Sequence, residues 1–168
     1  MAGMKRTIRI GGAAATVLAL LSAIIAGGGT AAAAPQPDDT VIVDVTNTVF
    51  LVPTPPQRVK VYADGRIITN GDSPSGLVQL RGSRTDVADL RAIAEGVLRN
   101  RPAVDTTSKI FDGSAVNATV RTADGTVLRA NLDNPEPRGW PALGNLTYDL
   151  RKRIFPIPGE RAPYVEKR

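Results

Sequence analysis

The fold of this chain is decided by an alternating stretch with an Asp-Gly step in its middle, Val59-Lys60-Val61-Tyr62-Ala63-Asp64-Gly65-Arg66-Ile67-Ile68-Thr69. Apolar and polar side chains alternate before the step, which is typical of a strand with one buried face. An Asp-Gly pair between two such runs indicates a tight hairpin, because both turn positions accept a positive φ. The stretch therefore predicts two antiparallel strands that meet at Gly65.

The same signal recurs farther along the chain. Val116 to Arg121 alternates, Asp124-Gly125 follows, and Thr126 to Leu132 returns. We therefore expect a second hairpin with the same Ala-Asp-Gly turn. A bulky side chain in place of either turn glycine should destabilise the domain, because a positive φ strains residues that carry a Cβ.

Two further strands are predicted beside the hairpins. Thr40 to Val52 alternates, so that one side would carry Val41, Val43 and Val45 and the other Ile42, Asp44 and Thr46. A run of prolines ends this strand, because proline cannot donate to a strand ladder. The other strand is Leu77 to Arg81, between the first hairpin and the helix that follows it.

Each hairpin leads to a helix with one apolar stripe. The first stripe consists of Val87, Leu90, Ile93, Ala94, Val97 and Leu98. Thr85 or Asp86 is its expected N-cap, and the helix should stop before Pro102. The second stripe consists of Leu143, Leu146, Leu150 and Ile154. Pro141 suits the first turn of that helix, and three consecutive cations, Arg151 to Arg153, suit the negative end of its dipole.

These elements predict an α+β fold. Each helix has only one stripe to bury, so a single antiparallel sheet of about five to six strands with both helices on one face is the economical arrangement. The repeated order of turn, hairpin and helix leaves a duplicated ββα unit as an alternative description. We expect the domain to span residues 41–155, followed by a flexible C-terminal tail, 156–168, with several prolines and charges.

The N-terminus has the three parts of an export signal. Lys5, Arg6 and Arg9 precede an uncharged apolar stretch that ends in four alanines, Ala31 to Ala34. We predict a signal peptide at 1–34, cleaved after Ala33 or Ala34, and a polar linker at 35–40. Without a twin-arginine pair, the general secretory route is favoured. An uncleaved membrane anchor is the alternative, since about 20 apolar residues suffice to span a bilayer.

Composition excludes several kinds of chemistry. The 168-residue chain has no cysteine and no histidine, so disulfides, thiol catalysis and the commonest zinc ligands are absent. Its formal net charge is +5, but three cations belong to the predicted signal peptide, which has no Asp or Glu. The domain itself is therefore only weakly basic, which gives little support to nucleic-acid binding.

Residues that could act as catalysts or metal ligands have simpler structural interpretations. Ser108 and Lys109 are adjacent, and neighbours on an extended segment point to opposite faces. Asp86 and Asp89 fall in the first helical turn, where acidic groups favour the helix dipole. Asp72, Asp133 and Glu136 lie in turns without the spacing of a calcium loop. We therefore expect no enzyme activity, no cofactor and no metal.

Binding residues are sought on the sheet face opposite the helices. If Val59, Val61, Val116, Val120, Leu128 and Leu132 face the helices, the other face carries Lys60, Tyr62, Asn117, Thr119, Arg121, Arg129 and Asn131. That set has three cations and no carboxylate. Lys60, Arg121 and Arg129 could attract an anion with Tyr62 as an aromatic contact, or they could form an ordinary solvated face. Trp140, in a proline-rich loop, is either a second anchor for a partner or a staple over the following helix.

The chain resembles an uncharacterised family of small exported domains from high-GC Gram-positive bacteria. The resemblance rests on the Tyr62-Ala63-Asp64-Gly65-Arg66 hairpin, the helix from Asp86 to Arg99 and the Thr122-Ala123-Asp124-Gly125 hairpin, and it covers roughly residues 41–155. It implies export and carries no activity with it.

The sequence thus predicts a non-catalytic domain, secreted or held at the cell envelope. Its expected partner is a protein or an anionic envelope polymer. Two alternatives stay open. One is a membrane-tethered accessory subunit with an uncleaved signal anchor, and the other is a hydrolase that uses carboxylates or serine without histidine.

Overall fold

A computed structural model describes residues 38–50, 53–71, 76–107 and 113–166. The predicted signal peptide and the first half of the predicted linker, residues 35–37, lie outside these ranges. Within them, no helix is both long enough and apolar enough to cross a bilayer.

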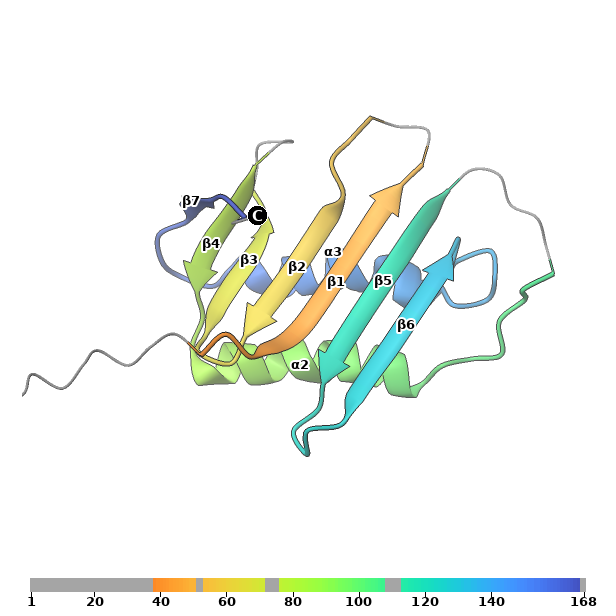
Figure 1. Ribbon diagram of the computed structural model, residues 1–168, viewed down its shortest axis with the longest axis horizontal. Coiled ribbons are helices and arrows are strands. Elements are labelled where there is room, and N and C mark those ends of the chain that lie inside the picture. Colours follow the sequence, from red (N-terminus) through yellow and green to blue (C-terminus); the bar gives the residue numbers. More distant parts are fainter. Residues whose placement is uncertain (1–37, 51–52, 72–75, 108–112, 167–168) are drawn as a thin grey trace, which may run out of the picture. The chain divides into compact units, whose positions relative to one another are not determined.

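The described residues form one antiparallel sheet of seven strands. In chain order the strands are β1 (Val41–Val49), β2 (Gln57–Tyr62), β3 (Arg66–Asn70), β4 (Leu77–Arg81), β5 (Ser114–Arg121), β6 (Val127–Asp133) and β7 (Ala162–Tyr164). Their order across the sheet is β6-β5-β1-β2-β3-β4-β7 (Figure 1). The first strand therefore lies between the two predicted hairpins. The predicted α+β fold with a single antiparallel sheet is confirmed, but the sheet has seven strands and not the predicted five to six.

Both helices cover the same face of the sheet (Figure 1). Helix α2 (Arg84–Arg99) packs on β5 and β6, and helix α3 (Pro141–Ile154) packs on β1 and β2, with the two helices in contact. Arg153 of α3 also binds Asp89 of α2 at 2.6 Å and Asp86 at 3.3 Å. Asp86 and Asp89 thus join the two helices. Of the two, only Asp86 lies in the first turn, because the helix starts at Arg84, earlier than its apolar stripe indicated.

The core lies between the sheet and the helices. Fully buried side chains from both layers meet there: Val43, Val45, Val59, Val61, Val116, Val120, Leu90, Leu143, Leu146 and Leu150. Leu128 and Leu132 pack against them. Burying a side chain of this size contributes about 1.5–3 kcal/mol. The buried side chains come from the predicted alternation of the strands and from the predicted stripes of the helices.

A β-bulge changes the alternation predicted at the start of β1. The pairing of β1 with β2 shifts register between Val41 and Val43. As a result Ile42 joins the core beside Val43, although strict alternation places it on the opposite face.

The N-cap of α2 is Ser83, not Thr85 or Asp86. The Ser83 hydroxyl accepts the Asp86 N–H at 3.1 Å, and the Asp86 carboxylate accepts the Ser83 N–H at 2.8 Å. This capping box uses Asp86 as its third helical residue, so the helix starts earlier than its apolar stripe. The hydrogen bonds from Ser83 lower the pKa of Asp86.

The segment predicted as a flexible tail contributes the seventh strand. Ala162 to Tyr164 pairs with β4, and Ile157 is buried in the core. The prediction failed because three residues are too few for a visible alternation and because Pro163 argued against a strand. Proline is tolerated at an edge, where one side of the strand needs no hydrogen bonds.

Candidate functional site

Four of the five predicted binding residues lie on the sheet face away from the helices. Lys60 and Tyr62 alternate on β2 with buried valines, and Arg121 and Arg129 alternate on β5 and β6 with Val120 and Ala130. We call this surface the outer face. The alternation argument placed these residues on the correct side of the sheet.

A carboxylate omitted from the predicted set lies on the outer face. Asp44 of β1 is 3.4 Å from Lys60 Nζ and 3.7 Å from Arg58 Nε. Arg58 also binds Glu166 at 2.8 Å. The outer face is therefore a network of mixed charge, because β1 lies between the two hairpins and contributes its own polar side chains.

Tyr62 is covered and takes part in packing. Only 9% of the residue is exposed, and the Arg66 guanidinium lies 4.3 Å from the centre of its ring. Burial raises the pKa of the Tyr62 hydroxyl. A ring already stacked in this way offers little surface to a partner.

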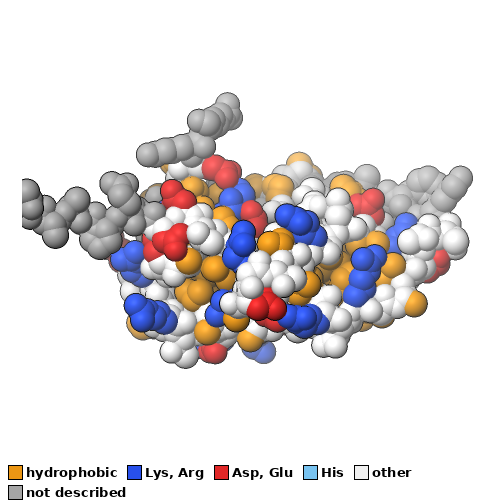
Figure 2. All heavy atoms as spheres, turned by 60° about the horizontal axis from the view of Figure 1, so that its bottom comes forward, with side chains coloured by type: hydrophobic (Ala, Val, Ile, Leu, Met, Phe, Trp, Pro, Cys, Tyr) orange, Lys and Arg blue, Asp and Glu red, His pale blue; other side chains and the backbone are white. Residues whose placement is uncertain are grey.

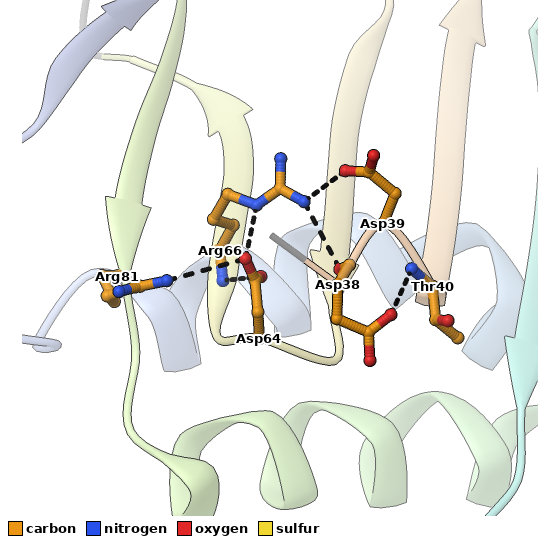
Figure 3. Close-up of polar contacts among 6 residues, drawn as sticks. All are labelled: Asp38, Asp39, Thr40, Asp64, Arg66 and Arg81. Carbon is orange, nitrogen blue, oxygen red and sulfur yellow. Dashed lines mark hydrogen bonds and ion pairs between the residues drawn. The ribbon is translucent and has the colours of Figure 1, made fainter. Parts of the chain in front are cut away.

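The Arg66 guanidinium joins the start of β1 to the β2–β3 turn (Figure 3). It donates to Asp64 at 2.8 Å and to Asp39 at 2.6 Å, and Arg81 approaches Asp64 at 3.6 Å. Asp38 accepts the Thr40 N–H at 2.9 Å. Every cation and carboxylate labelled in this close-up has a partner. The cluster therefore stabilises the packing of the β2–β3 turn against the residues before β1.

Arg121 and Arg129 remain exposed on the outer face. They line a shallow hollow of about 410 Å³ together with Asp39, Asp44, Thr40, Val41, Thr119 and Val127. The negative charges of Asp39 and Asp44 in the same hollow offset the positive charges of the two arginines. On the side seen in Figure 2, basic and acidic side chains are likewise interspersed.

Trp140 does not lie with the other predicted binding residues. It is 3% exposed, belongs to the core and occupies the N-cap position of α3. Arg101 lies 5.6 Å from the centre of its ring. This burial matches the staple interpretation, in which the ring folds over the start of the helix.

A different surface combines positive charge with a hollow. A cleft of about 340 Å³ lies between the ends of β3 and β4, the second half of α3 and the segment after it. Three cations line it, Arg151, Lys152 and Arg161, and no Asp or Glu of the described residues does. We call it the α3 cleft.

The α3 cleft also has an apolar lining. Val78 and Ile154 line it, together with two rings that are largely open to solvent, Tyr148 at 64% and Phe155 at 73% exposure. Arg161 donates to the Phe155 carbonyl at 2.9 Å, which holds the C-terminal segment against the helix end. None of the three cations forms a salt bridge with another described residue.

Sequence reasoning missed this cleft, although part of its signal is present. Tyr148, Arg151, Lys152 and Phe155 recur at helical spacing and form a second stripe beside the apolar one. The cations were assigned only to the helix dipole. Their convergence with Val78 and Arg161 depends on contacts between segments that are distant in the sequence.

Within the described ranges, no group of three or more Asp or Glu residues could hold a metal ion. Ser108 and Lys109 lie outside those ranges, as does Asp72. No family model, no curated protein and no solved structure matches this chain.

Proposed function

We propose that this protein is an exported, non-catalytic binding domain that holds an anionic group of a cell-envelope or extracellular partner in the α3 cleft. The observation that carries the proposal is the convergence of three cations without salt bridges on a hollow with two exposed aromatic rings. Export rests on the predicted signal peptide and on the family resemblance.

Charge supports an anion as the ligand. A planar guanidinium can bind a carboxylate or phosphate with two parallel hydrogen bonds, and Arg151 and Arg161 each carry one. Lys152 adds a compact charge beside them. The C-terminal end of α3 has partial negative charge from its free carbonyl groups, which the cations more than offset.

The shape supports a ligand with an apolar part. A volume of about 340 Å³ lies near the lower end of the usual size range of ligand pockets. Tyr148 and Phe155 provide rigid apolar surface beside the cations, so an anionic group attached to a hydrophobic or ring-containing unit would contact both. Among the described residues, the hollow on the outer face has Val41 and Val127 as its apolar lining and no aromatic ring.

Two charge-matched double variants test the site. Arg151→Glu with Lys152→Glu reverses the sign of the charge that lines the cleft. Lys60→Glu with Arg121→Glu makes the same change in charge on the outer face. We expect the cleft variant to bind an isolated envelope fraction at least tenfold more weakly than the parent, which is about 1.4 kcal/mol. The outer-face variant should bind like the parent.

Circular dichroism confirms that both variants are folded, and binding is measured at several salt concentrations. Parent binding should weaken as salt rises, because exposed charges are screened beyond about 8 Å at physiological ionic strength. N-terminal sequencing of the same exported protein should read from Ala34 or Pro35. Equal binding by the folded cleft variant would contradict the proposed site, and an intact Met1 in the membrane pellet would favour the anchored alternative.

A further inference from the structure

The two edges of the sheet are built differently. The edge strand β7 has three residues, and its middle residue is Pro163, which has no N–H. The opposite edge strand, β6, has seven residues without proline and pairs with β5 over its whole length without a register shift. Short strands, prolines and charged side chains are the usual means of keeping an edge from pairing with another chain. β6 is neither short nor interrupted by proline, and its charged residues are Arg129 and Asp133.

The hydrogen bonds at the ends of the β5–β6 ladder show which backbone groups of β6 face outward. Thr122 N donates to Thr126 O at 2.9 Å, and Asn134 N donates to Ser114 O at 2.6 Å. Antiparallel pairs alternate between bonded and non-bonded residues, so the even-numbered residues of β6 bond to β5. The odd-numbered residues direct their N–H and C=O groups to the open edge: Val127, Arg129, Asn131 and Asp133.

These outward groups are unpaired within the described ranges. No described residue forms a backbone hydrogen bond with them on the open side. Arg129, Asn131 and Asp133 are exposed, and neither Arg129 nor Asp133 forms a salt bridge with another described residue. The edge thus presents a cation and a carboxylate on either side of a neutral Asn131.

This pattern is complementary to itself. In an antiparallel pair of two β6 strands with Asn131 opposite its own copy, Arg129 of each chain lies opposite Asp133 of the other. Opposite charges in cross-strand positions stabilise a sheet, whereas like charges directly opposite destabilise it. A register with Arg129 opposite itself is therefore disfavoured, and the one centred on Asn131 is favoured.

We propose that two copies of this protein form a symmetric dimer through antiparallel pairing of their β6 strands in the register centred on Asn131. Each seven-stranded sheet then continues into the other. The contact is isologous, since the same strand serves both partners, and it closes after two chains. It uses a surface different from the α3 cleft, so an experiment that contradicts one proposal leaves the other unaffected.

A charge swap tests the dimer and its register. The mature domain, studied by analytical ultracentrifugation over a range of concentrations, should be dimeric. Arg129→Asp or Asp133→Arg alone places like charges opposite each other and should weaken the dimer at least tenfold. The double variant Arg129→Asp with Asp133→Arg restores opposite charges and should dimerise like the parent. A parent that stays monomeric at all concentrations, or a double variant as weak as the single ones, would overturn the proposal.

Cysteine substitution measures the register directly, because the chain has no cysteine. Asn131→Cys places two thiols in a bonded cross-strand pair with Cα atoms about 5.5 Å apart, within the range that a disulfide accepts. Mild oxidation should therefore yield a cross-linked dimer. Val127→Cys is the matched control, since it keeps the Arg129–Asp133 pairs, while its two copies lie eight residues apart along the ladder and should not cross-link. Equal cross-linking of both variants would contradict the register.

Discussion

Gly65 and Gly125 have nearly the same left-handed backbone angle, with φ of +91° and +88°, in completely different surroundings. A Cβ added at Gly65 would lie 2.6 Å from the Gly82 carbonyl oxygen, whereas one added at Gly125 would meet no atom within 4 Å. The two hairpins share their turn chemistry, but only the first turn packs against another segment of backbone. Gly82 in fact donates to the Gly65 carbonyl at 2.9 Å.

Alanine at the two turn glycines should therefore have unequal effects. Gly125→Ala introduces only backbone strain and should lower the free energy of unfolding by about 1–2 kcal/mol. Gly65→Ala adds a clash with the Gly82 carbonyl and should lower the free energy of unfolding by clearly more than Gly125→Ala does. Urea denaturation of the mature domain measures both.

Asparagine at the same positions separates strain from crowding. Asn tolerates a left-handed backbone, so Gly125→Asn should be nearly neutral while Gly65→Asn stays destabilising. If the two asparagine variants lose equal amounts of unfolding free energy, the close approach of Gly82 to Gly65 is not present in solution.

Trp140 should report the state of the core. Truncation of a buried aromatic costs about 3–5 kcal/mol, so Trp140→Ala should lose most of the stability of the domain. Phe155→Ala is the aromatic control, because Phe155 is 73% exposed and its loss should change stability by no more than about 0.5 kcal/mol.

Fluorescence gives a second measure of the same residue, since Trp140 is the only tryptophan. Its emission in the folded domain should resist quenching by iodide and should shift to the red on unfolding. Strong quenching in the folded state would show that the Trp140 ring is exposed, as the interpretation of Trp140 as a surface anchor requires.

Asp124 should contribute to the acid sensitivity of the domain. Hydrogen bonds from the Thr122 hydroxyl and from the Thr126 N–H lower the pKa of Asp124 from 3.8 to about 2. The folded state therefore favours the ionised form more than the unfolded state does. The resulting stabilisation is fully present above pH 3.8 and is lost as the pH falls toward 2.

Asp124→Asn tests this contribution. The variant should show a smaller fall in urea midpoint between neutral and acid pH than the parent. Asp149→Asn, which removes an exposed carboxylate of α3 outside the turn, is the matched control and should retain the parent profile. Identical profiles for the parent and Asp124→Asn would show that the turn does not stabilise the carboxylate.

Sequence patterns predicted the elements whose signals are local. Alternation and Asp-Gly identified both hairpins, and the stripes around Leu90 and Leu146 identified both helices. The cap at Ser83 was missed because the apolar stripe begins later than the helix. Strand β7 was missed because Pro163 argued against pairing and because its only partner, β4, is distant in the sequence.

The candidate sites were predicted less well, for a physical reason. Alternation assigned Lys60 and Arg121 to the correct face, since the side of a strand follows from the parity of its residues. It did not show that β1 lies between the hairpins and brings Asp44 beside Lys60. It also did not show that Tyr62 is covered by Arg66, because that contact depends on the pairing register.

The sequence by itself determined the hairpins, the helices, the single buried face and the absence of cysteine and histidine chemistry, because each follows from local periodicity or composition. Only the tertiary structure decided the order of the strands, the open edge at β6 and the α3 cleft. The strand order and the α3 cleft arise where segments distant in the chain meet, and β6 is left at an edge because β1 pairs with the other side of β5. Local side-chain patterns do not specify such meetings, because the free energy that selects them comes from the packing of the whole core.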